Sequence, residues 1–196
     1  ATIGASELII NSDGSIFHLH IRPEELADTV ILVGDPGRVD MVSSFFQTIE
    51  FKRESREFVS CTGMYNGKRM TVLSTGIGCD NLDIVMNELD ALVNIDFDTK
   101  EVKKELKSLR ILRIGTSGSI QPDIPVGAYV FSHISLGADG LLNWYANRDE
   151  VSYKEMEEAF VRDVNWDENL PRPYFIKAAD ELVDLFKDCT HKGVTI

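Results

Sequence analysis

Three short strand-like segments of the sequence each run into a turn that contains glycine, and this pattern restricts the fold more than any other feature. Segments 29–34 and 109–114 have the composition of buried strands, and 68–74 is strand-like. Apolar residues at helical spacing follow the first two turns, at 39–46 and from about residue 81. Strands that alternate with helices in this way predict a single α/β domain around a sheet.

A β-hairpin is predicted where segments 57–65 and 68–74 flank Asn66-Gly67. Asn-Gly is the strongest short hairpin signal, because both residues of such a turn adopt positive φ. The short helix after the first strand has a predicted apolar face made of Val39, Met41, Val42, Phe45 and Phe46.

The rest of the chain supplies weaker patterns. The charged stretch 94–108 predicts a solvent-facing connecting loop and helix, and 126–136 predicts a third buried strand. A helix is predicted at about 174–189, and residues 193–196 have the pattern of the beginning of another strand. Without a repeat or a linker, we expect one domain over 1–196. Because nothing follows the last strand to complete a sheet or a site, we expect this domain to be incomplete at its C-terminus.

The charge of the chain restricts its partners. Asp and Glu number 32 against 20 Lys and Arg, which gives a net charge of −12. Such a surface repels nucleic acid and anionic membranes, so neither is an expected partner. A membrane span needs about 20 consecutive apolar residues, and no run of that kind is seen. A small anionic substrate stays possible, because a few arginines in a cleft can reverse the field locally.

Cysteine and histidine usage indicates neither a disulfide framework nor a metal site. The cysteines are Cys61, Cys79 and Cys189, without a Cys-x-x-Cys pair, and the four histidines are scattered. This pattern is typical of a reducing compartment, and residues 1–7 have no basic region followed by an apolar block, as a secretory signal would. We therefore expect a cytoplasmic protein without a bound metal.

The glycine turns and two arginines predict a site for an oxyanion. Ligands of open α/β sheets bind at the carboxyl ends of strands, where glycine lets backbone N–H groups approach an anion closely. Arg38 follows the first turn, and Arg113 precedes the third inside an otherwise apolar strand. A buried arginine needs a partner, which is either a carboxylate in a structural ion pair or a bound oxyanion. The glycines are Gly34 and Gly37, Gly76 and Gly78, and Gly115 and Gly118.

Other nucleotide-binding and catalytic motifs match poorly. The turn at Gly76-Ile77-Gly78 lacks the third glycine of a dinucleotide-binding fingerprint. The turn at 115–119 ends in Ser119 where a nucleophile elbow has glycine, and no lysine of the P-loop type follows a glycine turn.

Five segments, in family order, resemble the nucleoside phosphorylase family, and uridine phosphorylase more than the bacterial purine enzymes. The resemblance extends over nearly the whole chain and implies a three-layer αβα sandwich with a central mixed, barrel-like twisted sheet. The five segments are Phe17-His18-Leu19, Val33-Gly34-Asp35-Pro36-Gly37-Arg38, Ser55-Arg56-Glu57-Phe58, Ser74-Thr75-Gly76-Ile77-Gly78 and Leu112-Arg113-Ile114-Gly115-Thr116-Ser117-Gly118.

The resemblance also implies roles for individual residues. Gly34 would bind phosphate through its backbone N–H group, and Arg38 and Arg113 would hold the same anion. Thr116 would contact phosphate and lie beside the ribose, so that Arg113 and Thr116 are the expected catalytic residues. Across a subunit interface, Arg56 would bind phosphate and His18 would bind the ribose 5′-hydroxyl. The alternatives are a surface ion pair of Arg56 with a neighbouring glutamate and a partly exposed, structural His18.

The implied activity is phosphorolysis of a nucleoside to free base and ribose 1-phosphate by a uridine-phosphorylase-like pentosyltransferase. Inorganic phosphate would be the co-substrate, without a metal or other cofactor, in a homodimer or a hexamer of dimers. A purine nucleoside phosphorylase, a nucleosidase and a non-catalytic truncated homologue are the alternatives. The arginines argue against a nucleosidase, which uses water in place of phosphate.

Overall fold

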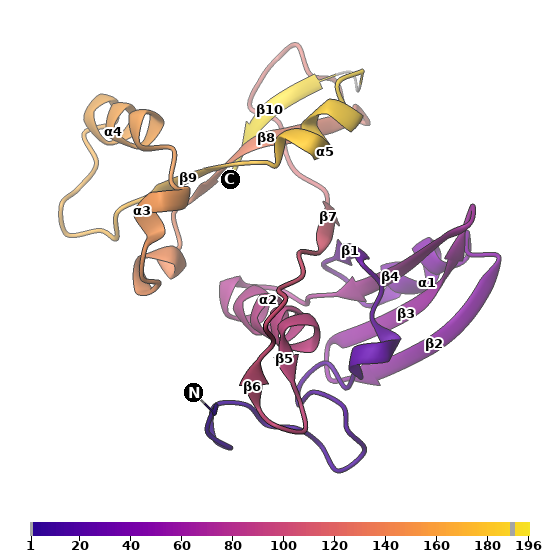
Figure 1. Ribbon diagram of the computed structural model, residues 1–196. Helices are drawn as coiled ribbons and strands as arrows, with labels where there is room; N and C mark the ends of the chain where they lie inside the picture. Colours follow the sequence, from indigo (N-terminus) through magenta and orange to yellow (C-terminus); the bar gives the residue numbers. More distant parts are fainter. Residues whose placement is uncertain (1, 189–190) are drawn as a thin grey trace. The chain divides into compact units, whose positions relative to one another are not determined.

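The computed structural model describes residues 2–188 and 191–196, so that Cys189 and the last position of the helix predicted near the C-terminus lie outside the described residues. The chain divides into two compact units, Ala1–Thr116 and Ser117–Ile196 (Figure 1). Each unit contains its own sheet. The expectation of one domain over 1–196 stays a prediction. Within the described residues, no helix is long and apolar enough to cross a membrane.

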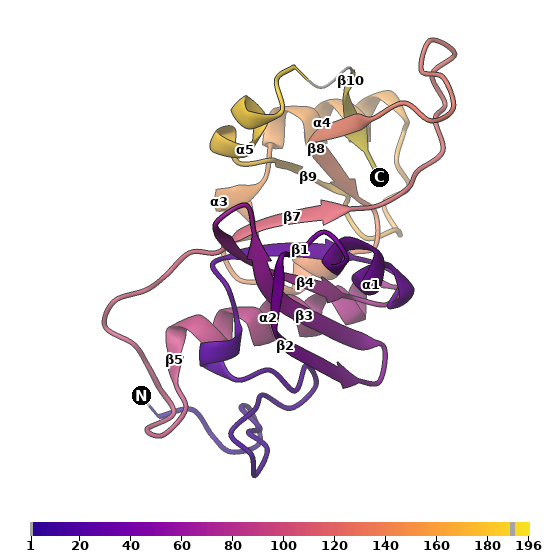
Figure 2. The same cartoon turned by 90° about the vertical axis from the view of Figure 1, so that its right-hand side faces the viewer.

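A five-stranded mixed sheet forms the centre of the first unit. The strand order is β2-β3-β4-β1-β7, and Figure 2 shows β4, β1 and β7 side by side. Strand β1 is parallel to both β4 and β7, whereas β2, β3 and β4 pair antiparallel. The strands are β1 (Thr29–Val33), β2 (Thr48–Ser55), β3 (Phe58–Tyr65), β4 (Lys68–Ser74) and β7 (Arg110–Ile114).

The predicted hairpin is confirmed. Strands β3 and β4 pair from Tyr65↔Lys68 onward, and the turn between them is Asn66-Gly67 with φ of 46° and 76°. Two consecutive residues of positive φ match the right-handed twist of the strands that they join, which explains the Asn-Gly sequence.

Helices α1 (Gly37–Ser43) and α2 (Cys79–Asn94) cover opposite faces of this sheet. Side chains alternate along β1, so that Val30 and Leu32 belong to a buried cluster with Leu89 of α2, while Val33 belongs to another with Val39 of α1. The first unit is therefore a three-layer αβα arrangement around a mixed sheet, as predicted.

The predicted apolar face of α1 is only partly correct. Val39, Val42 and Phe46 pack against the sheet, but Met41 and Phe45 are 66% and 68% exposed. At 100° per residue, positions 41 and 45 point away from the side that contains 39, 42 and 46. The apolar residues of this segment thus lie on both sides of a short helix, and only one of these sides packs against the sheet.

The helix predicted within 94–108 is wrong. Two short antiparallel strands, β5 (Ile95–Asp96) and β6 (Glu101–Val102), occupy the segment instead. The Asp96 carboxylate accepts the backbone N–H groups of Asp98 and Thr99 at 3.0 and 2.9 Å. Such an Asp side chain offers the backbone an alternative to helical hydrogen bonds and favours a turn.

A buried ion pair ties the N-terminal segment to β2. Glu25, in the short 3-10 helix η1 (Pro23–Glu25), is buried and accepts Arg53 Nε at 3.1 Å and the backbone N–H of Arg22 at 3.1 Å. Burial by itself raises the pKa of the Glu25 carboxyl, but the hydrogen bonds and the charges of Arg53 and Arg22 lower it, and the net effect is a pKa below its ordinary value.

The second unit has a three-stranded sheet of order β10-β8-β9, in which β8 is parallel to β10 and antiparallel to β9. The third predicted strand and the C-terminal strand are confirmed as β8 and β10. The elements are β8 (Val130–Gly137), η2 (Leu141–Trp144), α3 (Arg148–Val151), α4 (Lys154–Asp163), β9 (Tyr174–Lys177), α5 (Asp180–Leu185) and β10 (His191–Thr195).

The helix predicted at about 174–189 is wrong in its first part, where β9 runs through 174–177. Phe175 of β9 is buried against Ile134 and Leu136 of β8. This cross-strand packing determines the local structure, although the apolar residues of the segment also fit a helical period. Only Asp180–Leu185 is helical.

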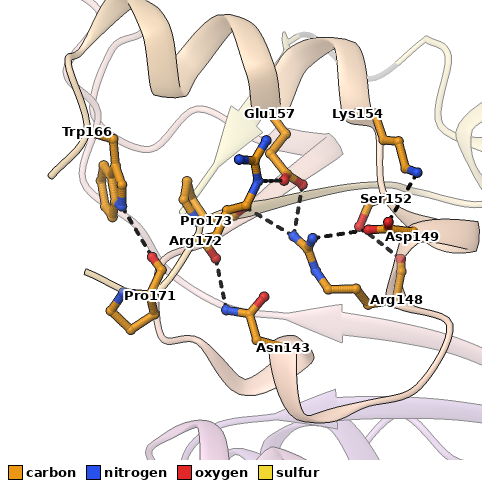
Figure 3. A network of polar contacts seen from close by, with 10 residues as sticks. All are labelled: Asn143, Arg148, Asp149, Ser152, Lys154, Glu157, Trp166, Pro171, Arg172 and Pro173. Carbon is orange, nitrogen blue, oxygen red and sulfur yellow. Dashed lines mark hydrogen bonds and ion pairs between the residues drawn. The ribbon is translucent and has the colours of Figure 1, made fainter. Parts of the chain in front are cut away.

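A network of polar contacts centred on Glu157 organises the segment between β8 and β9 (Figure 3). Glu157 of α4 is 3% exposed and accepts Arg148 Nη2 at 2.9 Å, and its other carboxylate oxygen accepts Arg172 Nε. Asn143 Nδ2 donates to the backbone carbonyl of Arg172 at 3.0 Å. One buried carboxylate thereby joins α3, α4 and the chain that leads into β9.

Candidate functional site

A pocket of about 650 Å³ lies at the carboxyl ends of β1, β4 and β7, entirely within the first unit. All three glycine turns contribute to its lining, which includes Gly34, Gly76, Gly78 and Gly115. Because the three strands are parallel, their carboxyl ends meet at one edge of the sheet. The sequence prediction that these turns form a common site is therefore consistent with the geometry.

The first two turns are joined by backbone hydrogen bonds that continue the sheet. Thr75 N–H donates to Val33 O at 2.8 Å, and Gly76 N–H donates to Gly34 O at 3.0 Å. The register of β1 and β4, which ends at Val33↔Ser74, thus extends into the loops. The pairing fixes the Gly34 turn relative to the Gly76 turn.

Glycine is required at position 76. Its φ is +70°, and a Cβ there would lie 2.6 Å from Asn81 Nδ2 and 2.8 Å from Glu57 Cγ. A Cβ at Gly34 would instead lie in ordinary contact, 3.9 Å from Arg113 Nη2. The distance of 3.9 Å places the Arg113 guanidinium beside the first glycine turn.

The first turn directs Arg38 into the pocket wall. The Asp35 carboxylate accepts the backbone N–H of Gly37 at 2.6 Å, and Asp35 O accepts that of Arg38 at 3.1 Å. These bonds start α1 directly after the turn, and Arg38 on its first turn lines the pocket.

Arg38, Arg113 and Thr116 line the same pocket as Gly34, so the structure brings these four predicted phosphate ligands together. Neither arginine forms an ion pair with a carboxylate of residues 2–188 or 191–196. The prediction that Arg113 is buried is wrong, because its strand β7 is an edge of the first unit's sheet and the residue is exposed.

Glu57 and Asn81 are polar residues of the pocket that the sequence did not single out as site residues. Asn81 Nδ2 donates to Glu57 Oε1 at 3.0 Å, and both side chains line the pocket. Glu57 follows Arg56 in a segment that was singled out, and Asn81 lies in the first turn of α2, where side chains border a helix N-terminus. Their positions, beside Arg56 and at the start of the helix after the Gly76 turn, were the sequence features that could have indicated a place in the site.

The N-terminus of α2 adds to the field in the pocket. Gly78, with φ of 101°, precedes this 16-residue helix, and Gly78, Asn81 and Leu82 line the pocket. Free backbone N–H groups and the helix dipole favour an anion at this end. The charged side chains of the lining are the guanidinium groups of Arg38 and Arg113 and the carboxylates of Asp35 and Glu57.

Arg56 and His18 lie outside this pocket and close to one another. Arg56 is in the turn between β2 and β3, with φ of 55°, and its Cζ is 5.9 Å from the centroid of the Phe17 ring. The Phe17 ring contacts the His18 ring edge-on at a centroid distance of 4.8 Å. His18 Nδ1 lies 2.6 Å from Glu88 Oε1 of α2. We call Phe17, His18, Arg56 and Glu88 the His18 cluster.

The alternatives for Arg56 and His18 were a surface ion pair with a neighbouring glutamate and a partly exposed, structural histidine. Arg56 forms no ion pair with Glu54 or Glu57 in the described structure, and Glu57 contacts Asn81 instead. His18 lies in a turn rather than a strand and is paired with Glu88. No group of three or more His, Cys, Asp or Glu residues suited to a metal ion is found among the described residues.

Comparison with known proteins relates residues 28–196 to the family model described as "Phosphorylase superfamily". The chain is 34% identical over 127 residues to a DeoD-type purine nucleoside phosphorylase of Thermoanaerobacter sp. (strain X514), covering 64% of this chain and 48% of that protein. It is 30% identical over 145 residues to a uridine phosphorylase of Thermococcus kodakarensis, covering 74% and 47%. The chain thus spans about half the length of these relatives.

Solved structures agree with the family relation. A Trypanosoma brucei nucleoside phosphorylase, described as showing uridine phosphorylase activity, is similar with a TM-score of 0.82 and 29% identity, over 96% of this chain and 67% of that one. A uridine phosphorylase of Vibrio fischeri has a TM-score of 0.62 at 19% identity, over 95% and 65%, which supports the fold alone.

Proposed function

Because the chain belongs to the phosphorylase superfamily, we propose that it acts in the phosphorolysis of a nucleoside, as a uridine-phosphorylase-like pentosyltransferase. One observation carries the proposal: Arg38 of α1 and Arg113 of β7 line one pocket with the glycine turns and have no ion-pair partner among the described residues. Inorganic phosphate is the proposed co-substrate, and no other cofactor is part of the proposal.

Phosphate binding follows from the chemistry of the lining. The Gly34 backbone N–H group and the N-terminus of α2 would donate to phosphate oxygens, and the two guanidinium groups would add charge-assisted hydrogen bonds. Thr116 would donate its hydroxyl hydrogen from the third turn. Among the described residues, neither arginine is paired with the Asp35 or Glu57 carboxylate, which accept hydrogen bonds from Gly37 N–H and the Asn81 amide.

The reaction uses the bound phosphate as nucleophile. A phosphate oxygen attacks the anomeric carbon of the ribose, the C–O bond forms as the glycosidic C–N bond breaks, and the electron pair of that bond leaves with the base. The transition state has oxocarbenium character, so an anion held in line stabilises it electrostatically. Arg113 and Thr116 are the proposed catalytic residues, since they would contact the attacking phosphate.

Arg56 and His18 are proposed to act in the site of a neighbouring subunit, on phosphate and on the ribose 5′-hydroxyl. Their position outside the pocket of their own chain, together in the His18 cluster, supports this division. The proposal therefore includes a homo-oligomer, a dimer or a hexamer of dimers, in the cytoplasm.

Assays of the full chain test the proposal. Uracil should be released from uridine only when inorganic phosphate is present, with ribose 1-phosphate as the second product. Release of hypoxanthine from inosine, without reaction of uridine, would instead support a purine nucleoside phosphorylase, which the similarity to a DeoD-type enzyme favours as the second candidate. Equal release with and without phosphate would contradict phosphorolysis and indicate a nucleosidase.

A further inference from the structure

The carboxylate of Glu88, in the middle of α2, forms hydrogen bonds to one short segment of the described chain, His18 and Leu19. Its side chain is 12% exposed, and its carboxylate accepts three N–H groups. His18 Nδ1 lies 2.6 Å from Oε1, the backbone N–H of His18 donates to Oε1 at 3.0 Å, and that of Leu19 donates to Oε2 at 2.9 Å. The carboxylate therefore fixes both the backbone and the ring of His18.

This geometry determines which nitrogen of the neutral ring carries the hydrogen. An ionised carboxylate only accepts hydrogen bonds, so Nδ1 must be the donor. In the neutral imidazole, Nε2 then has a free lone pair and is an acceptor. Nε2 forms no hydrogen bond to the part of the chain that the structure describes, and the His18 side chain is 27% exposed. An acceptor nitrogen is thus available to a ligand.

Phe17 restricts the ring from another side. The Phe17 and His18 rings meet at 4.8 Å between centroids and an interplanar angle of 76°. Arg56 Cζ in turn lies 5.9 Å from the centroid of the Phe17 ring. With Nδ1 held by Glu88 and one edge in contact with Phe17, the direction of Nε2 is set before a ligand binds.

We propose that Glu88 is a positioning residue for substrate recognition: it keeps His18 in the Nδ1–H tautomer, so that Nε2 accepts a hydrogen bond from the ribose 5′-hydroxyl. This inference rests on the proposed function of His18. It predicts selectivity at the 5′ position of the nucleoside, because only a ligand with a hydrogen-bond donor there can donate to Nε2. A 5′-deoxynucleoside lacks the donor. A 5′-phosphate dianion also lacks it, and it would approach the Glu88 carboxylate.

The variant Glu88→Gln tests the role of the carboxylate. Glutamine has one acceptor oxygen and one NH2 group, so either orientation of its amide makes an N–H group face another donor. The matched control is Asp90→Asn, which removes the same formal charge from the same helix without contacting His18. The full chain should prefer uridine over 5′-deoxyuridine by roughly 3- to 10-fold in kcat/KM, the effect of one hydrogen bond. This preference should fall to about 1 in Glu88→Gln and persist in Asp90→Asn.

Nuclear magnetic resonance gives a readout that does not need activity. In protein with 15N-labelled histidine, the long-range ¹H–¹⁵N pattern of neutral His18, assigned by comparison with His18→Gln, should be that of the Nδ1–H tautomer. The Nε2–H tautomer should gain population in Glu88→Gln. An Nε2–H pattern in the unsubstituted chain would overturn the proposal, even if the variant fails to fold.

The two assays separate the two proposals. If uridine is not phosphorolysed at all while the Nδ1–H tautomer is found, the proposed function fails and the pairing of Glu88 with His18 stands. If uridine is phosphorolysed but Glu88→Gln keeps the full preference for the 5′-hydroxyl, the positioning role fails and the proposed function stands.

Discussion

Replacing Arg113 by alanine should weaken phosphate binding and leave the stability of the chain nearly unchanged. The structure supports both halves of this expectation. The guanidinium group lies beside Gly34 and Gly115 in the pocket, at 3.9 Å from the position of a Cβ on Gly34. The residue is exposed and forms no ion pair with the described residues, so its removal deprives no other charged group of a partner.

The size of the effect follows from the contact that is lost. A hydrogen bond between charged groups contributes about 1.5–3 kcal/mol, which corresponds to about a 10- to 150-fold increase in the Kd for phosphate. The Kd of Arg113→Lys for phosphate should lie between those of the unsubstituted chain and Arg113→Ala. Lysine keeps the positive charge but not the two-pronged geometry of the guanidinium group. Exposed substitutions of this kind change the free energy of unfolding by about 0.5 kcal/mol or less.

Isothermal titration calorimetry with inorganic phosphate and urea denaturation measure the two quantities separately. Arg162→Ala is the control, since Arg162 is an exposed arginine of α4 outside the pocket. An Arg113→Ala variant that binds phosphate as tightly as this control would refute the assignment of Arg113. A loss of binding that accompanies unfolding would show that Arg113 acts on stability instead.

Three further predictions concern the packing of the chain. Gly76→Ala should lower the free energy of unfolding by about 1–3 kcal/mol, because its φ is +70° and the new Cβ would meet Asn81; urea denaturation measures this loss. Glu157→Ala should cost about 3–5 kcal/mol in the same assay, since it leaves two arginines without their buried partner, and a loss below 1 kcal/mol would contradict this. The low folded-state pKa of Glu25 means that its stabilisation is present above its unfolded pKa and is lost as acid protonates the folded group. Urea denaturation at neutral and acidic pH should show a smaller acid-dependent loss in Arg53→Met than in the unsubstituted chain.

The elements that border the pocket could be predicted from sequence because local pattern and tertiary packing agree there. The strand at 29–33 is apolar from Val30 to Val33 since both of its faces are covered, and Asn66-Gly67 permits only a narrow set of turns. The convergence of Gly34 and Gly115 followed from the rule that parallel strands end at a common edge.

The remainder depended on contacts that no local pattern contains. Phe175 and its neighbours fit a helical period, yet pairing with β8 makes them a strand. The contact of Asn81 with Glu57 joins residues 24 positions apart, and that of Glu88 with His18 joins residues 70 apart. The exposure of Arg113 depends on its strand being at an edge of the sheet, which the sequence of that strand does not reveal.

The hydrogen bond from Gly76 N–H to Gly34 O joins two glycine turns of the pocket at the end of the parallel ladder beneath them. Because this hydrogen bond protects the Gly76 amide hydrogen, its exchange with solvent should be slower than that of the amides in the loop after Gly115. Under the proposed function, the pairing gives the backbone donors of these turns a fixed spacing, and adjustment to oxyanions of different size is left to the side chains of Arg38 and Arg113.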